Sequence, residues 1–259
     1  MNRFKGKVIC CDIDGTLIDD NFEIPKANLS AIDYFRSEGG IFTVATGRTP
    51  GGIARYMNEL KFDCPIVCQN GGAIYDYYKE EYLWHMDVPR EATEVIDYVL
   101  KHFPMSGVEI MSTTGAYCTK ENSSTRKHET DEHFKFLVAD TPQNVLGGWL
   151  KIVFANVPDI TDEVQSLLQK SEFYEKYQMV RSYSTYYEFV HKKTNKAFAV
   201  KELAKLLGID IVDFAVIGDN ENDCAMLSMP CKSFTPSSGV EMAKKCSDVV
   251  LKSSHNDGV

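Results

Sequence analysis

Short apolar runs alternate with helical patterns along the first part of the chain. Apolar runs bounded by glycine, asparagine or aspartate are typical of buried strands, whereas apolar residues three or four positions apart indicate helices. The order is a strand at 7–13, a helix from Pro25 to Gly39-Gly40, a strand at 41–45, a helix carrying Ile53, Met57 and Leu60, and a strand at 65–68. This alternation predicts a parallel sheet covered by helices.

The same alternation returns near the C-terminus. Its first helical pattern places Ala197, Val200 and Leu203 on one face, and a fully apolar run follows. The order is a helix at 195–207, a strand at 214–217, a short helix at 223–228, a strand around 233–235, a helix after Gly239 and a strand at 248–251. Because this pattern matches that of the first part, we predict that both ends of the chain build one sheet domain.

The middle of the chain, from Tyr75 to Phe189, has a different pattern. It is richer in aromatic residues, and strand-like stretches with alternating polarity occur at 150–154 and 186–190. Helical patterns at 91–102 and 159–170 separate them, whereas the polar, charged segment 123–132 predicts a loop. The predicted fold class is α/β, with a Rossmann-like parallel-sheet core at 1–80 and 190–259 and an inserted α+β cap domain at 81–189.

The composition is that of an ordinary globular protein and narrows the choice of partners. Of the 259 residues, 44% are hydrophobic and 25% are charged, and the formal net charge is -9. This charge repels nucleic acids and anionic membranes, so we expect neither as a partner, although a local basic pocket can still hold a small anion. No window reaches the roughly 20 consecutive apolar residues of a membrane span. Asp12 interrupts the first apolar run too early for a signal peptide.

The eight cysteines contain no Cys-x-x-Cys pair and no Cys/His grouping with the spacing of a zinc site. Scattered cysteines of this kind are typical of small buried side chains in a reducing compartment. We therefore expect free thiols and a cytoplasmic location.

Polar residues follow the predicted parallel strands, at the edge where ligands bind in such sheets. Asp12 and Asp14 project to the same side of the first strand, because side chains alternate along a strand. Two adjacent carboxylates repel each other unless a cation or a proton separates them. The other polar residues at strand or helix ends are Thr46, Arg48, Lys196, Asp219, Asn222 and Asp223. Together they offer carboxylates for a hard cation, and a lysine, a hydroxyl and an amide for an oxyanion.

The order of these residues resembles that of the haloacid dehalogenase (HAD) superfamily, and more narrowly its Cof-type sugar-phosphate phosphatases. The similar motifs are 12–17 (DIDGTL), 45–48 (ATGR), Lys196 and 218–223 (GDNEND), with Asn70-Gly71-Gly72 as a further landmark. The resemblance covers most of the chain, and the middle matches only as a cap of suitable size. It implies a HAD-like core with an inserted cap.

The resemblance also implies a reaction, the hydrolysis of a small organic phosphomonoester through an aspartyl-phosphate. In this interpretation Asp12 is the nucleophile. Asp14 protonates the leaving alcohol and then deprotonates the attacking water. Asp223 orients Lys196, and the cap excludes bulk water and recognises the leaving group.

Mg²⁺ is the cofactor that the resemblance implies, held by Asp12, the backbone carbonyl of Asp14 and Asp219. Thr46, Lys196 and Asn222 would bind the phosphoryl oxygens, and Thr46 and Lys196 also count among the catalytic residues. Arg48 either reaches the substrate or forms a surface salt bridge. The implied partner is a small phosphorylated metabolite, bound by a monomer or a small homo-oligomer.

Other interpretations stay open from the residues alone. A calcium loop beginning at Asp12 would have Glu23 as its twelfth residue, but Leu17 stands where that loop needs glycine. A phosphomutase would use the same aspartyl-phosphate and return the phosphoryl group to its substrate. A regulatory module would keep phosphate binding with weak catalysis, although binding alone does not need Asp14. Asn70 either faces the site or merely forms a turn.

Two departures from the family pattern do not affect the predicted catalytic residues. Ala197 replaces the glycine that usually follows the motif lysine, and the chain stops at Val259, where relatives usually continue into a final helix. These departures imply altered packing, not altered chemistry. The predicted cap has no motif that names the substrate, so Tyr117, Trp149 and Lys151 are only candidates for its recognition.

Overall fold

The computed structural model describes residues 2–131 and 134–257 and divides into two compact units. The first contains the chain up to Trp84 and from Asn195 onward, and the second contains His85–Thr194. Residues 81–84 and 190–194 therefore lie in the opposite unit from the one predicted. The reason is strand pairing, because β5 (Glu81–His85) joins a sheet of the first unit and β11 (Tyr186–His191) a sheet of the second.

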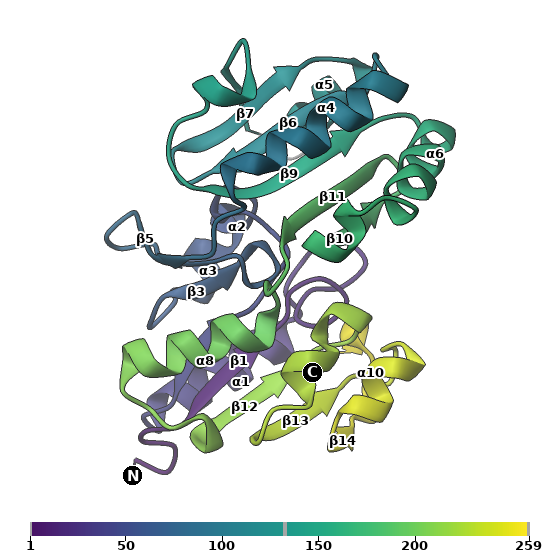
Figure 1. Cartoon of the computed structure of the whole chain (residues 1–259). Helices are drawn as coiled ribbons and strands as arrows, with labels where there is room; N and C mark the ends of the chain where they lie inside the picture. Colours follow the sequence, from purple (N-terminus) through teal and green to yellow (C-terminus); the bar gives the residue numbers. More distant parts are fainter. Residues whose placement is uncertain (1, 132–133, 258–259) are drawn as a thin grey trace. The chain divides into compact units, whose positions relative to one another are not determined.

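The first unit is built on a five-stranded parallel sheet in the order β14-β13-β12-β1-β2 (Figure 1). Strand β1 is paired on both sides, so that Val8 lies opposite Ile41 of β2 and Phe214 of β12. The strands are β1 Val8–Cys11, β2 Ile41–Val44, β12 Phe214–Ile217, β13 Lys232–Thr235 and β14 Val249–Val250. The predicted parallel sheet, built from both ends of the chain, is confirmed.

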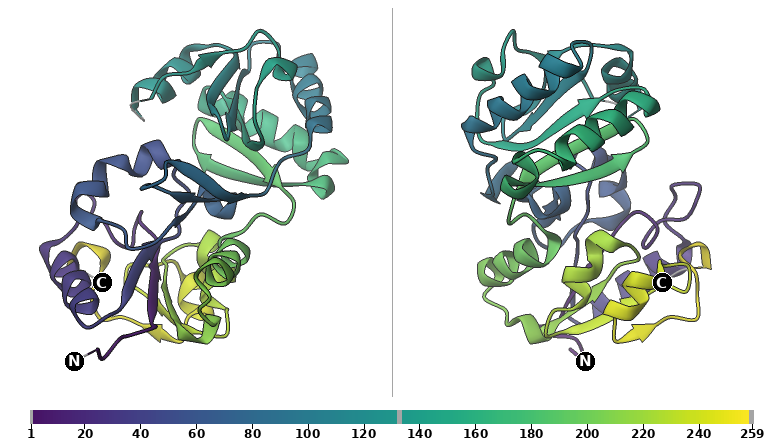
Figure 2. Two further views of the ribbon diagram at one scale, coloured as in Figure 1. Left: turned by 90° about the vertical axis from the view of Figure 1, so that its left-hand side faces the viewer. Right: turned by 45° about the vertical axis from the view of Figure 1, so that its right-hand side comes forward.

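Helices cover both faces of this sheet, which is why its central strands are almost continuously apolar. Helix α1 (Lys26–Ser37) lies on one face and α8 (Lys196–Leu207) on the other (Figure 2). Helix α8 begins at Asn195, whose side chain accepts a hydrogen bond from the Phe198 N–H at 2.8 Å. It ends at Gly208, which has a φ of 65°. This cap fixes where α8 starts, and hence the position of Lys196.

The helix predicted around Ile53, Met57 and Leu60 is broken into three short pieces, because Pro50 and two glycines open the segment. Tyr56, not Met57, is the buried residue between Ile53 and Leu60. These pieces are α2 Pro50–Ile53, η1 Ala54–Tyr56 and α3 Met57–Leu60. The other short helices are η2 Gln69–Gly71, η5 Ile211–Asp213, η6 Glu221–Asp223, α9 Cys224–Leu227, α10 Glu241–Cys246 and η7 His255–Asp257.

A three-stranded sheet of β3, β4 and β5 adjoins the parallel sheet. Its first strand β3 (Ile66–Cys68) is joined to the end of β2 by a parallel bridge between Ala45 and Val67. The second strand is β4 Ala73–Asp76. Trp84 in β5 packs near Phe198 of α8, with ring centroids 5.8 Å apart. This packing places Trp84 with the first unit.

The second unit is a six-stranded sheet in the order β10-β11-β9-β6-β7-β8, antiparallel except for the β7–β8 pair. Alternate residues such as Ile152 and Phe154 lie in a core formed with helices α4, α6 and α7. The strands are β6 Gly107–Ser112, β7 Gly115–Lys120, β8 Leu137–Val138, β9 Trp149–Ala155, β10 Tyr177–Tyr183 and β11 Tyr186–His191. The helices are η3 Arg90–Ala92, α4 Thr93–His102, α5 Ser123–Asp131, η4 Pro142–Asn144, α6 Pro158–Gln169 and α7 Phe173–Lys176.

The candidates for substrate recognition in this unit fall on different faces of its sheet. Tyr117 and Trp149 belong to the buried core beneath the helices. Lys151 directly precedes the core residue Ile152 in β9, so it projects to the opposite face of the sheet, and it forms an ion pair with Glu188 at 2.8 Å. The predicted α+β insertion is confirmed, and Lys151 is the one of the three that lies outside that core.

The loop predicted at 123–132 is wrong, because α5 covers Ser123–Asp131, and Glu132 lies outside the described residues. Asn122 supplies the missing signal, since its side chain accepts hydrogen bonds from the N–H groups of Ser124 and Thr125 at 2.9 and 3.0 Å. Lys127 and Asp131 add an ion pair along the helix at 2.5 Å. End capping, not an apolar face, explains this helix.

No helix in the described part of the chain has the length and apolar character needed to cross a membrane.

Candidate active site

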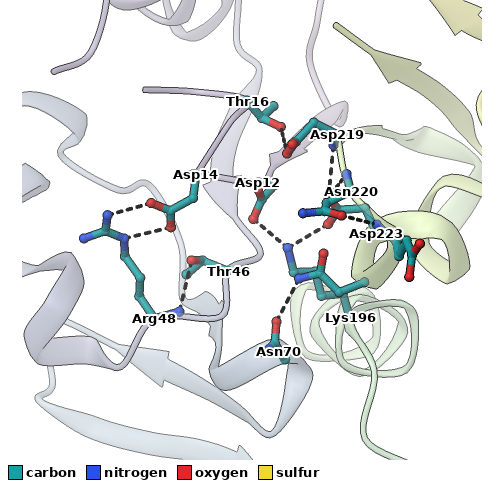
Figure 3. Close-up of polar contacts among 12 residues, drawn as sticks. Asp12, Asp14, Thr16, Thr46, Arg48, Asn70, Lys196, Asp219, Asn220 and Asp223 are labelled. Atoms are coloured by element: carbon teal, nitrogen blue, oxygen red, sulfur yellow. Dashed lines mark hydrogen bonds and ion pairs between the residues drawn. The ribbon is translucent and has the colours of Figure 1, made fainter. Parts of the chain in front are cut away.

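The centre of the site is a buried lysine between two aspartates at the carboxyl edge of the parallel sheet (Figure 3). Lys196 Nζ donates to Asp12 Oδ1 at 2.5 Å and to Asp223 Oδ1 at 2.7 Å. Asp12 directly follows β1, and its backbone N–H donates to the Ile217 carbonyl of β12 at 2.8 Å. Side chains of Lys196 and Asp223 have no solvent exposure, and that of Asp12 has 7%. Three charged groups from distant parts of the sequence therefore share a water-poor position.

The loop after β12 holds Asp223 in place through its other oxygen. Asp223 Oδ2 accepts hydrogen bonds from the backbone N–H groups of Asp219 and Asn220 at 3.0 and 3.1 Å. Asn220 and Asp223 form a capping box at the start of η6. Both oxygens of Asp223 are therefore engaged within the protein, so this residue fixes the orientation of Lys196.

Asp219 approaches the lysine-centred cluster from the end of β12. Its Oδ1 accepts a hydrogen bond from the Thr16 hydroxyl at 2.8 Å. The carboxylates of Asp12, Asp219 and Asp223 each offer an oxygen within 4.8 Å of the others. A donor set made only of carboxylate oxygens suits a hard cation such as Mg²⁺. Because both oxygens of Asp223 are engaged, Asp12 and Asp219 are the members best suited to hold it.

Burial and mutual repulsion shift the pKa values of this cluster. Burial raises the pKa of Asp12 above its ordinary value, with Asp223 and Asp219 adding to the rise and Lys196 opposing it. Burial also raises the pKa of Asp219, against the Thr16 hydrogen bond. Burial alone would lower the pKa of Lys196, but Asp12 and Asp223 outweigh it and the pKa is raised. A bound cation would favour the ionised form of Asp12 and Asp219.

Asp14 lies at the site but its carboxylate faces away from the cluster, toward Arg48 (Figure 3). Arg48 Nε donates to Asp14 Oδ2 at 2.8 Å and its Nη2 to Oδ1 at 2.6 Å. The Asp14 side chain is 48% exposed. Of the two alternatives for Arg48, the structure shows the ion pair. Both carboxylate oxygens of Asp14 are therefore engaged by Arg48.

Thr46 and Asn222 are the remaining predicted phosphate-binding residues. Thr46 is fully buried after β2, and its hydroxyl accepts a hydrogen bond from the Arg48 N–H at 3.1 Å. Asn222 is exposed in η6, and its Nδ2 donates to Asn70 Oδ1 at 3.0 Å. Both belong to the first unit, as do the other predicted site residues. Their binding roles stay predictions.

Two residues that the sequence analysis did not single out complete the arrangement. Thr16 fixes Asp219, and Asn220 forms the capping box that orders Asp223. The Asn-x-x-Asp spacing at 220–223 resembles a capping-box pattern and could have indicated Asn220. Glu23, the twelfth residue of the alternative calcium loop, is absent from the acidic group found among the described residues.

Gly71 has no Cβ, and this allows the segment after β3 to lie close to the start of α8. It has a φ of 88°, and a Cβ there would lie 2.2 Å from the carbonyl oxygen of Asn195. Gly208 has a similar φ of 65° but open space around its Cα. It therefore provides a matched control for the cost of the left-handed backbone alone.

We expect Gly71→Ala to lower the free energy of unfolding by about 3 kcal/mol or more, since it adds overpacking against backbone to left-handed strain. Gly208→Ala, which adds strain without overlap, is expected to cost about 1 kcal/mol. Urea unfolding of both variants measures the difference. Equal losses would show that the approach to Asn195 is not tight.

The amino-acid sequence is similar to known phosphatase sequences along nearly its whole length. The family model described as haloacid dehalogenase-like hydrolase matches residues 9–259. A conjectural phosphatase of Streptococcus pyogenes serotype M6 is 29% identical over 98% of this chain and 95% of its own length. The 5-amino-6-(5-phospho-D-ribitylamino)uracil phosphatase YcsE of Bacillus subtilis is 26% identical over 98% of this chain and 92% of its own. The match to the family spans the parallel sheet and the insertion alike.

The fold of the chain is similar to that of solved structures. The protein TM0651 of Thermotoga maritima superposes with a TM-score of 0.84 at 24% identity, covering 97% of this chain and 93% of its own. The likeness therefore includes both the parallel-sheet unit and the second unit with its antiparallel sheet. It confirms the predicted α/β fold with an inserted cap.

Proposed function

Because this chain belongs to the haloacid dehalogenase-like hydrolases, we propose that it is a phosphatase that cleaves small phosphomonoesters through an aspartyl-phosphate on Asp12. The observation that carries the proposal is the buried contact of Asp12 with Lys196, itself held by Asp223. A nucleophile beside a fixed cation can receive a phosphoryl group whose negative charge the cation offsets.

The proposed first step transfers the phosphoryl group from the substrate to Asp12. An Asp12 oxygen attacks phosphorus, the phosphorus–oxygen bond to the alcohol breaks, and Asp14 gives a proton to the leaving oxygen. In the second step Asp14 takes a proton from water as the water attacks the aspartyl-phosphate, which releases inorganic phosphate and restores Asp12. Arg48 must release Asp14 for these proton transfers, since it engages both carboxylate oxygens.

The phosphoryl oxygens would be bound by groups around Asp12. Lys196 supplies a positive charge, Thr46 a hydroxyl and Asn222 an amide, each from a separate segment of the first unit. Phosphoryl transfer depends mainly on positioning and charge stabilisation, so these groups account for most of the expected catalysis. Arg48 becomes a further candidate once it parts from Asp14.

Mg²⁺ is the cofactor that we propose for this site, because the acidic donors are hard oxygens crowded within 4.8 Å. Asp12 and Asp219 would hold it, together with the backbone carbonyl of Asp14. When bound, it would offset the repulsion among the carboxylates and the charge of the phosphoryl group.

Sugar phosphates are the substrate class that we propose. The support comes from the B. subtilis relative, whose name specifies a phosphorylated ribityl chain. Because the net charge of -9 repels polyanions, we expect nucleic acids to be poor substrates. A phosphomutase remains the alternative from the sequence analysis, and it would yield an isomerised phosphate and no free phosphate.

The experiment that tests the proposal measures inorganic phosphate released by the purified protein from p-nitrophenyl phosphate and from a panel of sugar phosphates, nucleotides, pyridoxal phosphate and flavin mononucleotide. We expect release from the sugar phosphates to exceed that from the nucleotides. No release from any member would reject the phosphatase. Isomerised product without phosphate would favour the mutase.

We expect EDTA to lower phosphate release about 100-fold and Mg²⁺ to restore it, since a catalytic cation contributes several kcal/mol of stabilisation. Mg²⁺ is also expected to raise the thermal unfolding temperature, because it would bind the folded carboxylate cluster. The Asp219→Asn variant should lose this rise, whereas Asp213→Asn, at a surface ion pair, should keep it. Equal responses of both variants would remove Asp219 from the metal site.

A further inference from the structure

Asn70 connects two parts of the candidate active site that are far apart in the sequence. Its Oδ1 accepts a hydrogen bond from Asn222 Nδ2 at 3.0 Å, and its backbone N–H donates to the Thr46 carbonyl at 2.9 Å. The N–H of the preceding Gln69 donates to the Arg48 carbonyl at 2.9 Å. The backbone of this segment is thus fixed to the loop after β2, while its side chain reaches the loop after β12 (Figure 3).

The segment adopts an uncommon backbone to do this. Gln69, Asn70 and Gly71 have φ values of 52°, 56° and 88°. Non-glycine residues rarely adopt positive φ, although asparagine does so more often than most, and such strain is held where the surroundings fix it, often at functional sites. Gln69 is 98% buried, and its Oε1 has no hydrogen-bond partner among the described residues. An ordinary turn needs neither the strain nor the buried amide oxygen.

Packing restricts the segment on both sides. A Cβ on Gly47 would lie 3.0 Å from Asn70 Oδ1, and one on Gly71 would lie 2.2 Å from the carbonyl oxygen of Asn195. Asn195 caps the helix that begins with Lys196. The segment therefore lies between the Thr46 loop and the start of α8, so the Asn70 side chain has little freedom to turn away from Asn222.

We propose that Asn70 is a positioning residue, which sets the direction of the Asn222 amide for phosphoryl binding. A side-chain amide has two N–H donors, and rotation of an exposed amide directs them to many positions. With one N–H held by Asn70, the second has a defined direction. The inference rests on the proposed function, since it names the residue that prepares Asn222 for its phosphoryl ligand.

A double-mutant cycle with Asn70→Gly and Asn222→Ala tests this role. Glycine keeps the left-handed backbone of residue 70 and removes the whole side chain, including the Oδ1 that accepts from Asn222. We expect Asn70→Gly to lower kcat/KM for p-nitrophenyl phosphate about 5- to 10-fold and to weaken competitive inhibition by inorganic phosphate by a similar factor. In the Asn222→Ala background, the same change is expected to alter kcat/KM less than about twofold, because its target is absent.

Glu80→Gly is the matched control, because Glu80 is an exposed residue of the first unit with a φ of 54°. It should leave kcat/KM and phosphate inhibition unchanged. Thermal unfolding temperatures of the Asn70 variants should also stay near that of the unaltered protein. Wild-type kinetics for Asn70→Gly, or losses that multiply in the double variant, would overturn the positioning role. An inactive unaltered protein would instead reject the proposed function.

Discussion

The Asp12→Asn variant is expected to lose phosphate release from p-nitrophenyl phosphate by about 10⁴-fold or more while keeping its fold. An amide oxygen is a far weaker nucleophile than a carboxylate oxygen, and loss of a catalytic nucleophile typically costs this much or more. The substitution keeps the shape of the side chain and leaves an oxygen to accept from Lys196 Nζ, which lies 2.5 Å from Asp12 Oδ1. Steady-state kinetics and urea unfolding together measure both parts of the prediction.

Asp213→Asn supplies the control for this variant. Asp213 belongs to the same unit and also accepts from a lysine at 2.5 Å, but its partner Lys7 is 52% exposed. Activity of this control should stay unchanged. Near-normal turnover by Asp12→Asn would remove Asp12 as the nucleophile. Mass spectrometry of the unaltered protein, quenched in acid during turnover, should find one phosphoryl group on the peptide containing Asp12.

The position of the carboxylate–lysine cluster could be predicted from the sequence because it follows from sheet geometry. Parallel strands align their carboxyl ends, so residues just after Cys11, Val44 and Ile217 meet at one edge. Burial on both faces makes these strands almost continuously apolar, and this pattern can be recognised in the sequence. The grouping of carboxylates and lysine was thus set by topology.

The finer contacts could not be predicted because they depend on side-chain directions and on unusual backbone. Asp14 and Asp12 were expected to face the same way, yet Arg48 draws the Asp14 carboxylate to itself. Likewise, a positive φ at Gln69 leaves no periodic trace in the sequence. The helix α5 shows the same limit, since its polar sequence lacks an apolar face and capping by Asn122 compensates. Local hydrogen bonds, not hydrophobic periodicity, decided each of these features.

Lys196 has a role in the proposed catalysis and a separate effect on stability, which comparison with another lysine can measure. Lys196 and Lys7 each donate to an aspartate at 2.5 Å. The difference is burial, because the Lys196 side chain is fully buried and that of Lys7 is 52% exposed. Exposed ion pairs contribute about 0–1 kcal/mol, whereas removal of one partner from a buried pair leaves an uncompensated charge and costs about 3–5 kcal/mol.

We therefore expect Lys196→Met to lower the free energy of unfolding by about 3–5 kcal/mol at neutral pH, and Lys7→Met by less than about 1 kcal/mol. Phosphate release by Lys196→Met should also fall about 10³-fold, since the phosphoryl group loses its buried positive partner. Urea unfolding and steady-state kinetics measure these effects. Similar stability losses for both lysine variants would contradict the buried cluster.

The pH dependence of Lys196→Met distinguishes charge from packing. Burial raises the pKa of Asp12 in the folded protein, and loss of the lysine removes the group that opposes this rise. A carboxyl whose folded pKa is raised binds more protons in the folded state, so stability falls as pH rises from about 3.9, the ordinary Asp value, to the raised one. The deficit of Lys196→Met should therefore shrink toward acid pH. A deficit independent of pH would mean that the lost lysine acted through packing, since a cavity does not titrate.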